Sequence, residues 1–242
     1  MRVFNDISRR YILLVFALFM LLGECCYDKA ILASQVSPLI NTREINQRNL
    51  SFDNFISFEG SSAGYYGKNE SNYLFKGVYI FSLSKKNSKE NLIINADILG
   101  YTGIYRVYEI EGYNGSYPYY GFGPAFYACL QFPIEKLRLG IGIYTGTAYE
   151  WGDFSKFRQN AADKGLIYKE TEKFPALFSI YPILRYRYSA NIAFAFQVAF
   201  GTPGFISPNL SVSIANVDLW ASALPLFTSG KLYSIGLAYK LF

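Results

Sequence analysis

The strongest constraint on the fold is a two-residue alternation of side chains in the C-terminal half of the sequence. Between Ala176 and Phe200, two runs place large apolar residues on one face and mostly small or polar residues on the other. The turn-like segment 189–191 separates the runs. A period of two is typical of a β-strand, because successive side chains leave opposite sides of the pleat. The pattern therefore predicts a β-hairpin.

The same alternation recurs along most of the chain and predicts ten strands. We expect these strands over 52–65, 73–83, 92–105, 119–132, 137–149, 176–188, 192–200, 209–216, 219–227 and 232–242. Their lengths suit tilted strands that cross a bilayer, which need roughly 9–11 residues. The segment 209–227 also fits one bent strand, so eight strands is the alternative. A short helix is predicted near 156–164.

The lengths of the predicted connections depend on their position in the chain. Connections after odd-numbered strands include the long segments 106–118 and 150–175, whereas those after even-numbered strands are short, such as 133–136 and 189–190. Outer-membrane barrels show this asymmetry, with short periplasmic turns and longer external loops. A soluble β-sandwich has no physical reason to sort its loops in this way.

The second face of the predicted strands has an unusual composition. It carries glycines and alanines, such as Gly142 and Ala195, where a water-exposed sheet would carry many charged residues. Small residues suit a narrow lumen that is packed around larger side chains. The sequence thus predicts an all-β protein, a single antiparallel up-and-down transmembrane β-barrel of 8–10 strands. The alternative is a secreted or lipid-anchored soluble β-sandwich that acts as a binding module.

A polar cluster is expected inside this lumen. Its predicted members are Asp97, Arg185, Arg187, Tyr144 and Tyr181. Such groups most often form ion pairs that hold a barrel core, and the sequence contains 0 histidines, which excludes His-dependent triads and imidazole bases. We therefore expect no enzyme activity, no catalytic residues, no metal site and no cofactor.

The N-terminus has the features of an export signal. Basic residues precede an apolar run over 11–22, which is short for a membrane-spanning helix. We predict a signal peptide over 1–26, with cleavage as late as residue 33, a flexible leader over 27–50 and a β-barrel domain over 51–242. Cys25 and Cys26 are candidate lipidation sites.

The last strand, Leu232 to Phe242, alternates apolar residues and ends the sequence on phenylalanine. It resembles the C-terminal strand of bacterial outer-membrane β-barrels, and the chain as a whole resembles the small OmpA-, OmpX- or OmpW-like class. In that class the terminal aromatic residue shares the apolar face, whereas Phe242 lies one position off it. The resemblance implies outer-membrane lipid and the barrel-assembly machinery as partners.

These observations favour an outer-membrane barrel with a structural, surface-exposed or narrow-pore, porin-like role. The external loops 106–118 and 150–175 are the candidate contact surfaces, because binding residues concentrate on loops. The net charge of +5 is spread along the chain. No basic cluster indicates nucleic acid.

Overall fold

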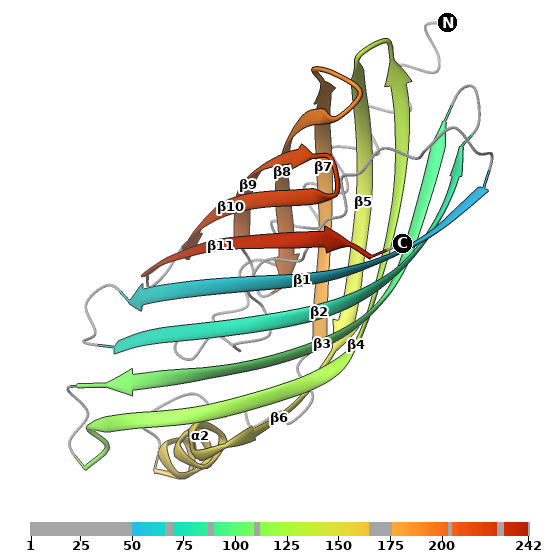
Figure 1. Ribbon diagram of the computed structural model, residues 1–242. Coiled ribbons are helices and arrows are strands. Elements are labelled where there is room, and N and C mark those ends of the chain that lie inside the picture. The colour runs from blue at the N-terminus through green and yellow to red at the C-terminus, as the bar shows by residue number, and fades with distance from the viewer. Residues whose placement is uncertain are drawn as a thin grey trace, which may run out of the picture.

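The protein forms a closed antiparallel β-barrel of ten strands. The computed structural model describes residues 50–65, 70–86, 90–108, 112–164, 176–202, 205–226 and 230–241. Figure 1 shows the strands around one continuous wall, with β1 next to β11. The predicted signal peptide with Cys25 and Cys26, nearly all of the leader, and Phe242 lie outside the described residues.

The first four strands are long and the later ones are shorter. They are β1 (Leu50–Tyr65), β2 (Glu70–Lys86), β3 (Asn91–Val107), β4 (Gly115–Ile134), β5 (Leu137–Thr147), β6 (Tyr149–Gly152), β7 (Ala176–Arg187), β8 (Ile192–Thr202), β9 (Phe205–Ile214), β10 (Val217–Leu226) and β11 (Gly230–Lys240), with the helix α2 (Asp153–Asp163) after β6. All ten predicted strands are present. The segment 209–227 contains two strands, which rules out the alternative of one bent strand.

The sheet order follows the chain around the barrel. Neighbouring strands run β3-β2-β1-β11-β10-β9-β8-β7-β5-β4, and the pairing of β3 with β4 closes the ring. β5 and β6 are two parts of one strand, since both pair with β4 and are separated at Ala148. Closure leaves no open sheet edge, which hydrocarbon does not tolerate. The sandwich alternative is therefore wrong, because a sandwich needs two separate sheets packed face to face.

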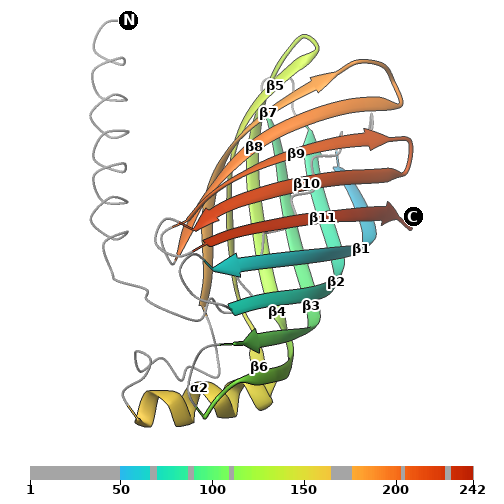
Figure 2. The ribbon, with the colours of Figure 1, turned by 90° about the vertical axis from the view of Figure 1, so that its left-hand side faces the viewer.

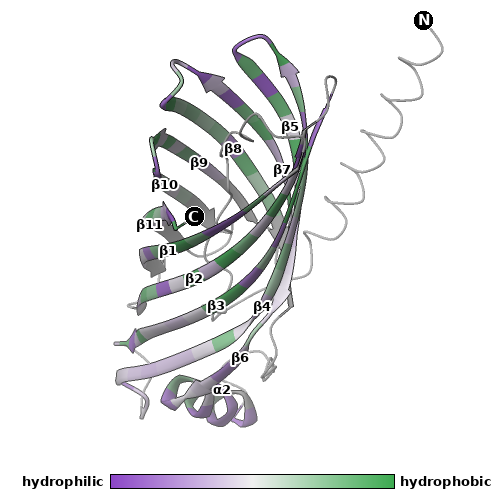
Figure 3. Cartoon of the chain, turned by 45° about the vertical axis from the view of Figure 1, so that its right-hand side comes forward, coloured by the Kyte–Doolittle hydropathy of each residue, from purple (hydrophilic) through white to green (hydrophobic). Residues whose placement is uncertain are grey.

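Inward and outward residues alternate as the sequence pattern requires. Along β3, buried positions alternate with exposed ones, apart from one intermediate position, over all 17 residues. The outward positions are largely apolar, such as Phe126 and Phe196, whereas the inward ones include Asn95, Asp97 and Gln131. Figure 3 shows hydrophobic and hydrophilic residues interspersed along the strands. An apolar exterior around a partly polar interior is the arrangement of a transmembrane barrel of the bacterial outer membrane.

The barrel wall is taller on one side. β1 to β4 have 16 to 20 residues, whereas β8 to β11 have 10 or 11. Because about 9–11 residues suffice to cross a bilayer, the long strands project beyond it. Figure 2 shows α2 at this projecting end, next to β6. The predicted loop 106–118 is shorter than expected, because β3 continues to Val107 and β4 begins at Gly115.

The opposite end of the barrel carries short turns. Two-residue turns at 135–136 and 215–216 join β4 to β5 and β9 to β10. Glu135 and Ala215 adopt positive φ angles of 52° and 47° there, the left-handed conformation that tight hairpin turns demand. Among the described residues, no helix combines the length and the apolar character that crossing a membrane would take.

Candidate functional site

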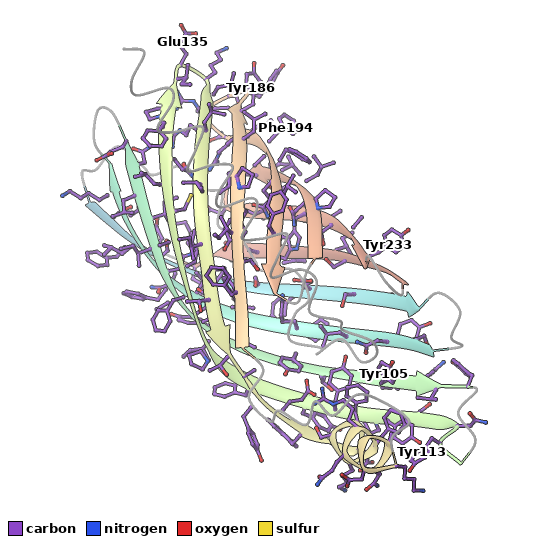
Figure 4. The ribbon with its side chains drawn as sticks, turned by 180° about the vertical axis from the view of Figure 1, so that it is seen from behind. Tyr105, Tyr113, Glu135, Tyr186, Phe194 and Tyr233 are labelled. Atoms are coloured by element: carbon purple, nitrogen blue, oxygen red, sulfur yellow. The ribbon has the colours of Figure 1, made fainter. Side chains whose placement is uncertain are left out.

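Helix α2 packs on the inward face of the projecting wall. Phe154 is completely buried, and its ring centroid lies 4.4 Å from that of Tyr105 on β3 and 5.5 Å from that of Tyr119 on β4. Phe157 stacks on Tyr117 at 4.5 Å. Ring separations of about 4.5–7 Å are favourable for aromatic pairs. Figure 4 shows Tyr105 beside α2, at the end of the barrel opposite Glu135. We call α2 with these aromatic partners the cap.

A buried polar contact fixes the orientation of the cap. Arg158 Nη2 of α2 donates to Glu150 Oε1 of β6 across 3.0 Å, and Tyr101 Oη of β3 donates to Glu150 Oε2 across 3.1 Å. The Arg158 guanidinium also lies 5.0 Å from the centroid of Phe154. Charge-assisted hydrogen bonds in a buried setting are strong. The helix, β6 and β3 are therefore tied together by one carboxylate.

Two tyrosine hydroxyls add to this arrangement. Tyr119 Oη donates to Asn72 Oδ1 of β2 across 2.6 Å, and Tyr117 Oη donates to the backbone oxygen of Tyr113 across 2.6 Å. Burial raises the pKa of the Tyr117 phenol, and the neighbouring Tyr113 phenol acts in the same direction. Tyr117 therefore stays a neutral hydrogen-bond donor over a wide pH range.

The outer face of the cap is polar and accessible. The exposed residues of α2 and its end are Asp153, Lys156, Gln159, Asn160, Asp163 and Lys164. The Lys156–Asp153 ion pair on this face, at 3.1 Å, is mostly solvent-exposed. The predicted contact segment 150–175 thus holds β6 and a helix that presents a polar surface, and its residues 165–175 lie outside the described part of the chain.

The structure buries four of the five predicted lumen residues and leaves the fifth exposed. Asp97, Arg185, Tyr144 and Tyr181 all point inward and are buried. Arg187 is instead exposed, because β7 ends there, beside the turn at 135–136. The role of these five residues as one polar cluster stays a prediction.

Two ion pairs that the sequence analysis did not single out lie in the barrel wall. Lys76 Nζ of β2 lies 2.7 Å from Glu59 Oε2 of β1, and both side chains are buried in the lumen. Lys240 of β11 pairs with Asp53 of β1 across the seam where the last strand meets the first. Lys76 and Glu59 share the inward parity of their strands, so strict alternation could have placed both side chains in the lumen, although not opposite each other.

The lumen is filled by side chains at mid-barrel. Tyr127 and Tyr181 stack with their ring centroids 5.8 Å apart. The exposed fractions of Tyr181, Asn95 and Tyr127 are 0%, 0% and 1%. Water therefore does not reach these inward groups, and small residues such as Gly142 leave room for the Tyr181 ring.

The aromatic residues at the projecting end of the barrel are divided between its two faces. Tyr105 and Tyr119 point inward and hold the cap. Tyr120, Tyr149 and Trp151 are exposed on the outward face, where Trp151 stacks on both tyrosines. Within the described ranges, no group of three or more His, Cys, Asp or Glu side chains is placed to hold a metal ion.

Comparisons with known proteins give structural likeness without a family. No family model matches the chain, and no curated protein matches it. Similar solved structures include Neisserial surface protein A (9% identity, 80% of this chain and 100% of that chain, TM-score 0.35) and OprG from Pseudomonas aeruginosa (10% identity, 78% and 96%, TM-score 0.34). The translocator domain of the autotransporter NalP from Neisseria meningitidis is similar at 8% identity, over 78% and 88%, with a TM-score of 0.43.

Proposed function

We propose that this outer-membrane barrel is a surface-exposed structural protein that presents the cap as a contact surface and does not form a wide pore. The observation that carries the proposal is the packing of the lumen, where the side chain of Tyr181 has an exposed fraction of 0%. A wide aqueous channel would leave the inward side chains accessible to water. We assign no catalytic chemistry to the protein.

The cap supports the second part of the proposal. Its aromatic residues pack against the barrel wall, whereas the side chains of Lys156, Gln159 and Lys164 are exposed to solvent. A rigid helix that keeps a polar face in solvent can present side chains in a fixed geometry, as binding sites on loops need a rigid scaffold. Short turns face the periplasm in outer-membrane barrels, which puts the cap on the external side.

Conductance tests the absence of a wide pore. We expect the purified full-length protein to give no steady current in planar bilayers, under conditions in which a general porin conducts. Small anion-selective steps would support the narrow-pore role instead. Large, weakly selective currents would overturn the proposal.

Cysteine labelling on intact cells tests the position of the cap. We expect Gln159→Cys to react with a membrane-impermeant maleimide, whereas Asn216→Cys, at the short turn 215–216, should react only after the outer membrane is opened. The wild-type chain provides the baseline, and its Cys129 is buried. The reverse labelling pattern would show that the cap faces the periplasm.

A further inference from the structure

A group of polar side chains lies inside the barrel, near the middle of strands β3 and β7. Asn95 and Asp97 are two positions apart on the inward face of β3, and Tyr181 points inward from β7. The exposed fraction is 2% for Asp97 and 0% for the other two. Asn95 pairs across the strands with Tyr127, whose ring stacks on that of Tyr181. We call Asn95, Asp97 and Tyr181 the mid-barrel site.

The polar atoms of the mid-barrel site lack protein partners. Among the described residues, neither carboxylate oxygen of Asp97 accepts a hydrogen bond. The side-chain oxygen and nitrogen of Asn95 and the hydroxyl of Tyr181 are likewise without a hydrogen-bond partner in that part of the chain. The Asp97 carboxylate lies within electrostatic range of the Tyr181 phenol, so the two groups border the same space. Buried polar atoms are almost always satisfied in proteins, so several such atoms in one place indicate a ligand.

The charge balance around Asp97 gives the sign of this ligand. Lys76 attracts the Asp97 carboxylate, but its ammonium group is paired with Glu59 at 2.7 Å. Arg185 also points inward, but it lies four positions beyond Tyr181 along β7, which is roughly 13 Å of strand. Two buried carboxylates thus share one nearby ammonium group within the described part of the lumen. A buried carboxylate without its own countercharge is strongly unfavourable, and a positive ligand removes that cost.

We propose that the mid-barrel site binds one alkali metal cation. Asp97 supplies the negative charge, and Asn95 Oδ1 and Tyr181 Oη supply neutral oxygen ligands, which hard cations prefer. One carboxylate matches a single positive charge, whereas calcium sites gather several carboxylates. The expectation of no metal site rested on the absence of histidine, which an alkali ion does not need. Because water does not reach these side chains, the ion is enclosed as the strands close, and this inference is independent of the role of the cap.

Reversible urea unfolding of the full chain in non-ionic detergent micelles tests the proposal, with sodium ions as the probe. Sodium chloride is replaced stepwise by choline chloride at constant ionic strength, because choline is too large for a packed lumen. A ligand of the folded state lowers the equilibrium constant of unfolding by mass action. We expect this constant to fall up to tenfold for each tenfold rise in free sodium above the dissociation constant. Equal constants in sodium and choline would overturn the proposal.

Asp97→Asn removes the charge of the site and keeps its shape. We expect this variant to lose the sodium dependence and to be at least as stable as the wild type in choline, because its buried carboxylate is gone. The matched control is Asp218→Asn, which makes the same change at another buried aspartate, beside the turn at 215–216, and should keep the sodium dependence. Heat-modifiable gel mobility verifies that both variants fold. A sodium effect that persists in Asp97→Asn, or that disappears in Asp218→Asn, would overturn the assignment.

Anomalous scattering from rubidium locates the ion. We expect one rubidium peak beside Asp97 and Asn95 in crystals of the wild type grown in rubidium chloride, and no peak at that position in Asp97→Asn. Rubidium found only on the protein surface would overturn the proposal and show an adventitious ion only. A wild-type stability that changes with pH but not with sodium would also overturn it and assign a proton to Asp97.

Discussion

Arg158 of α2 donates a hydrogen bond to Glu150 of β6 across 3.0 Å, and both side chains are almost completely removed from solvent. The two residues are eight positions apart in the sequence, on a strand and on the helix that follows it. Gly152 lies between them with a φ angle of 123°, a conformation that favours glycine. This sharp change of direction brings the helix back over the inward face of the wall. The contact is a buried polar restraint on the orientation of the cap.

Glu150→Gln should release the cap. Removing one charge of a buried pair leaves the other uncompensated, at a cost of roughly 3–5 kcal/mol. We expect faster hydrogen exchange of the α2 backbone amides, with the barrel strands unchanged. Lys156→Gln is the control, because the exposed Lys156–Asp153 pair is worth about 1 kcal/mol at most. Equal exchange in the two variants would contradict the role of Glu150.

Gly121→Ala should disturb the cap through the side chain of Tyr101. The ring of Tyr101 lies over Gly121, so a Cβ atom there would collide with it. Overpacking of this kind typically costs about 1–3 kcal/mol, and it would move Tyr101 away from Glu150. Gly60→Ala serves as the control, since nothing lies within 4 Å of its Cβ position. The midpoint of denaturant unfolding in micelles should fall for Gly121→Ala and stay close to wild type for the control.

Lys76→Met should destabilise the barrel through Glu59. The variant leaves the Glu59 carboxylate buried without its partner 2.7 Å away, and such losses cost roughly 3–5 kcal/mol. Replacing both residues with methionine removes the two charges together, which is often neutral or stabilising. We therefore expect the double variant to recover most of the free energy of unfolding. A double variant as unstable as Lys76→Met would show that the lysine acts through other contacts.

Phe196→Arg should impair membrane assembly. Phe196 points outward on β8, and an arginine on the lipid face costs about 2–4 kcal/mol near the middle of the bilayer. Tyr120→Arg, in the exposed aromatic group near the cap, should cost about 1 kcal/mol or less because charges are tolerated at the interface. Heat-modifiable gel mobility of detergent-extracted protein reports the folded fraction. Normal assembly of Phe196→Arg would contradict the outward assignment of β8.

The sequence by itself determined the strand content and the side of the wall on which each residue lies. A period of two needs no knowledge of distant contacts, because the pleat sends alternate side chains to opposite faces. This is why Asp97, Tyr144, Tyr181 and Arg185 could be placed inside, and why ten strands could be counted. The same alternation along β3 also predicts that Tyr105 points inward.

Only the tertiary structure decided which inward residues meet. Lys76 pairs with Glu59, and Glu150 with Arg158, because strand register and the path of α2 bring them together. Register depends on the pairing of whole strands, which a one-dimensional pattern leaves open. Closure of the ring likewise fixed where the wall is tall enough to hold a cap. The alternation of side chains is a local property of the chain, whereas these contacts depend on how all ten strands close.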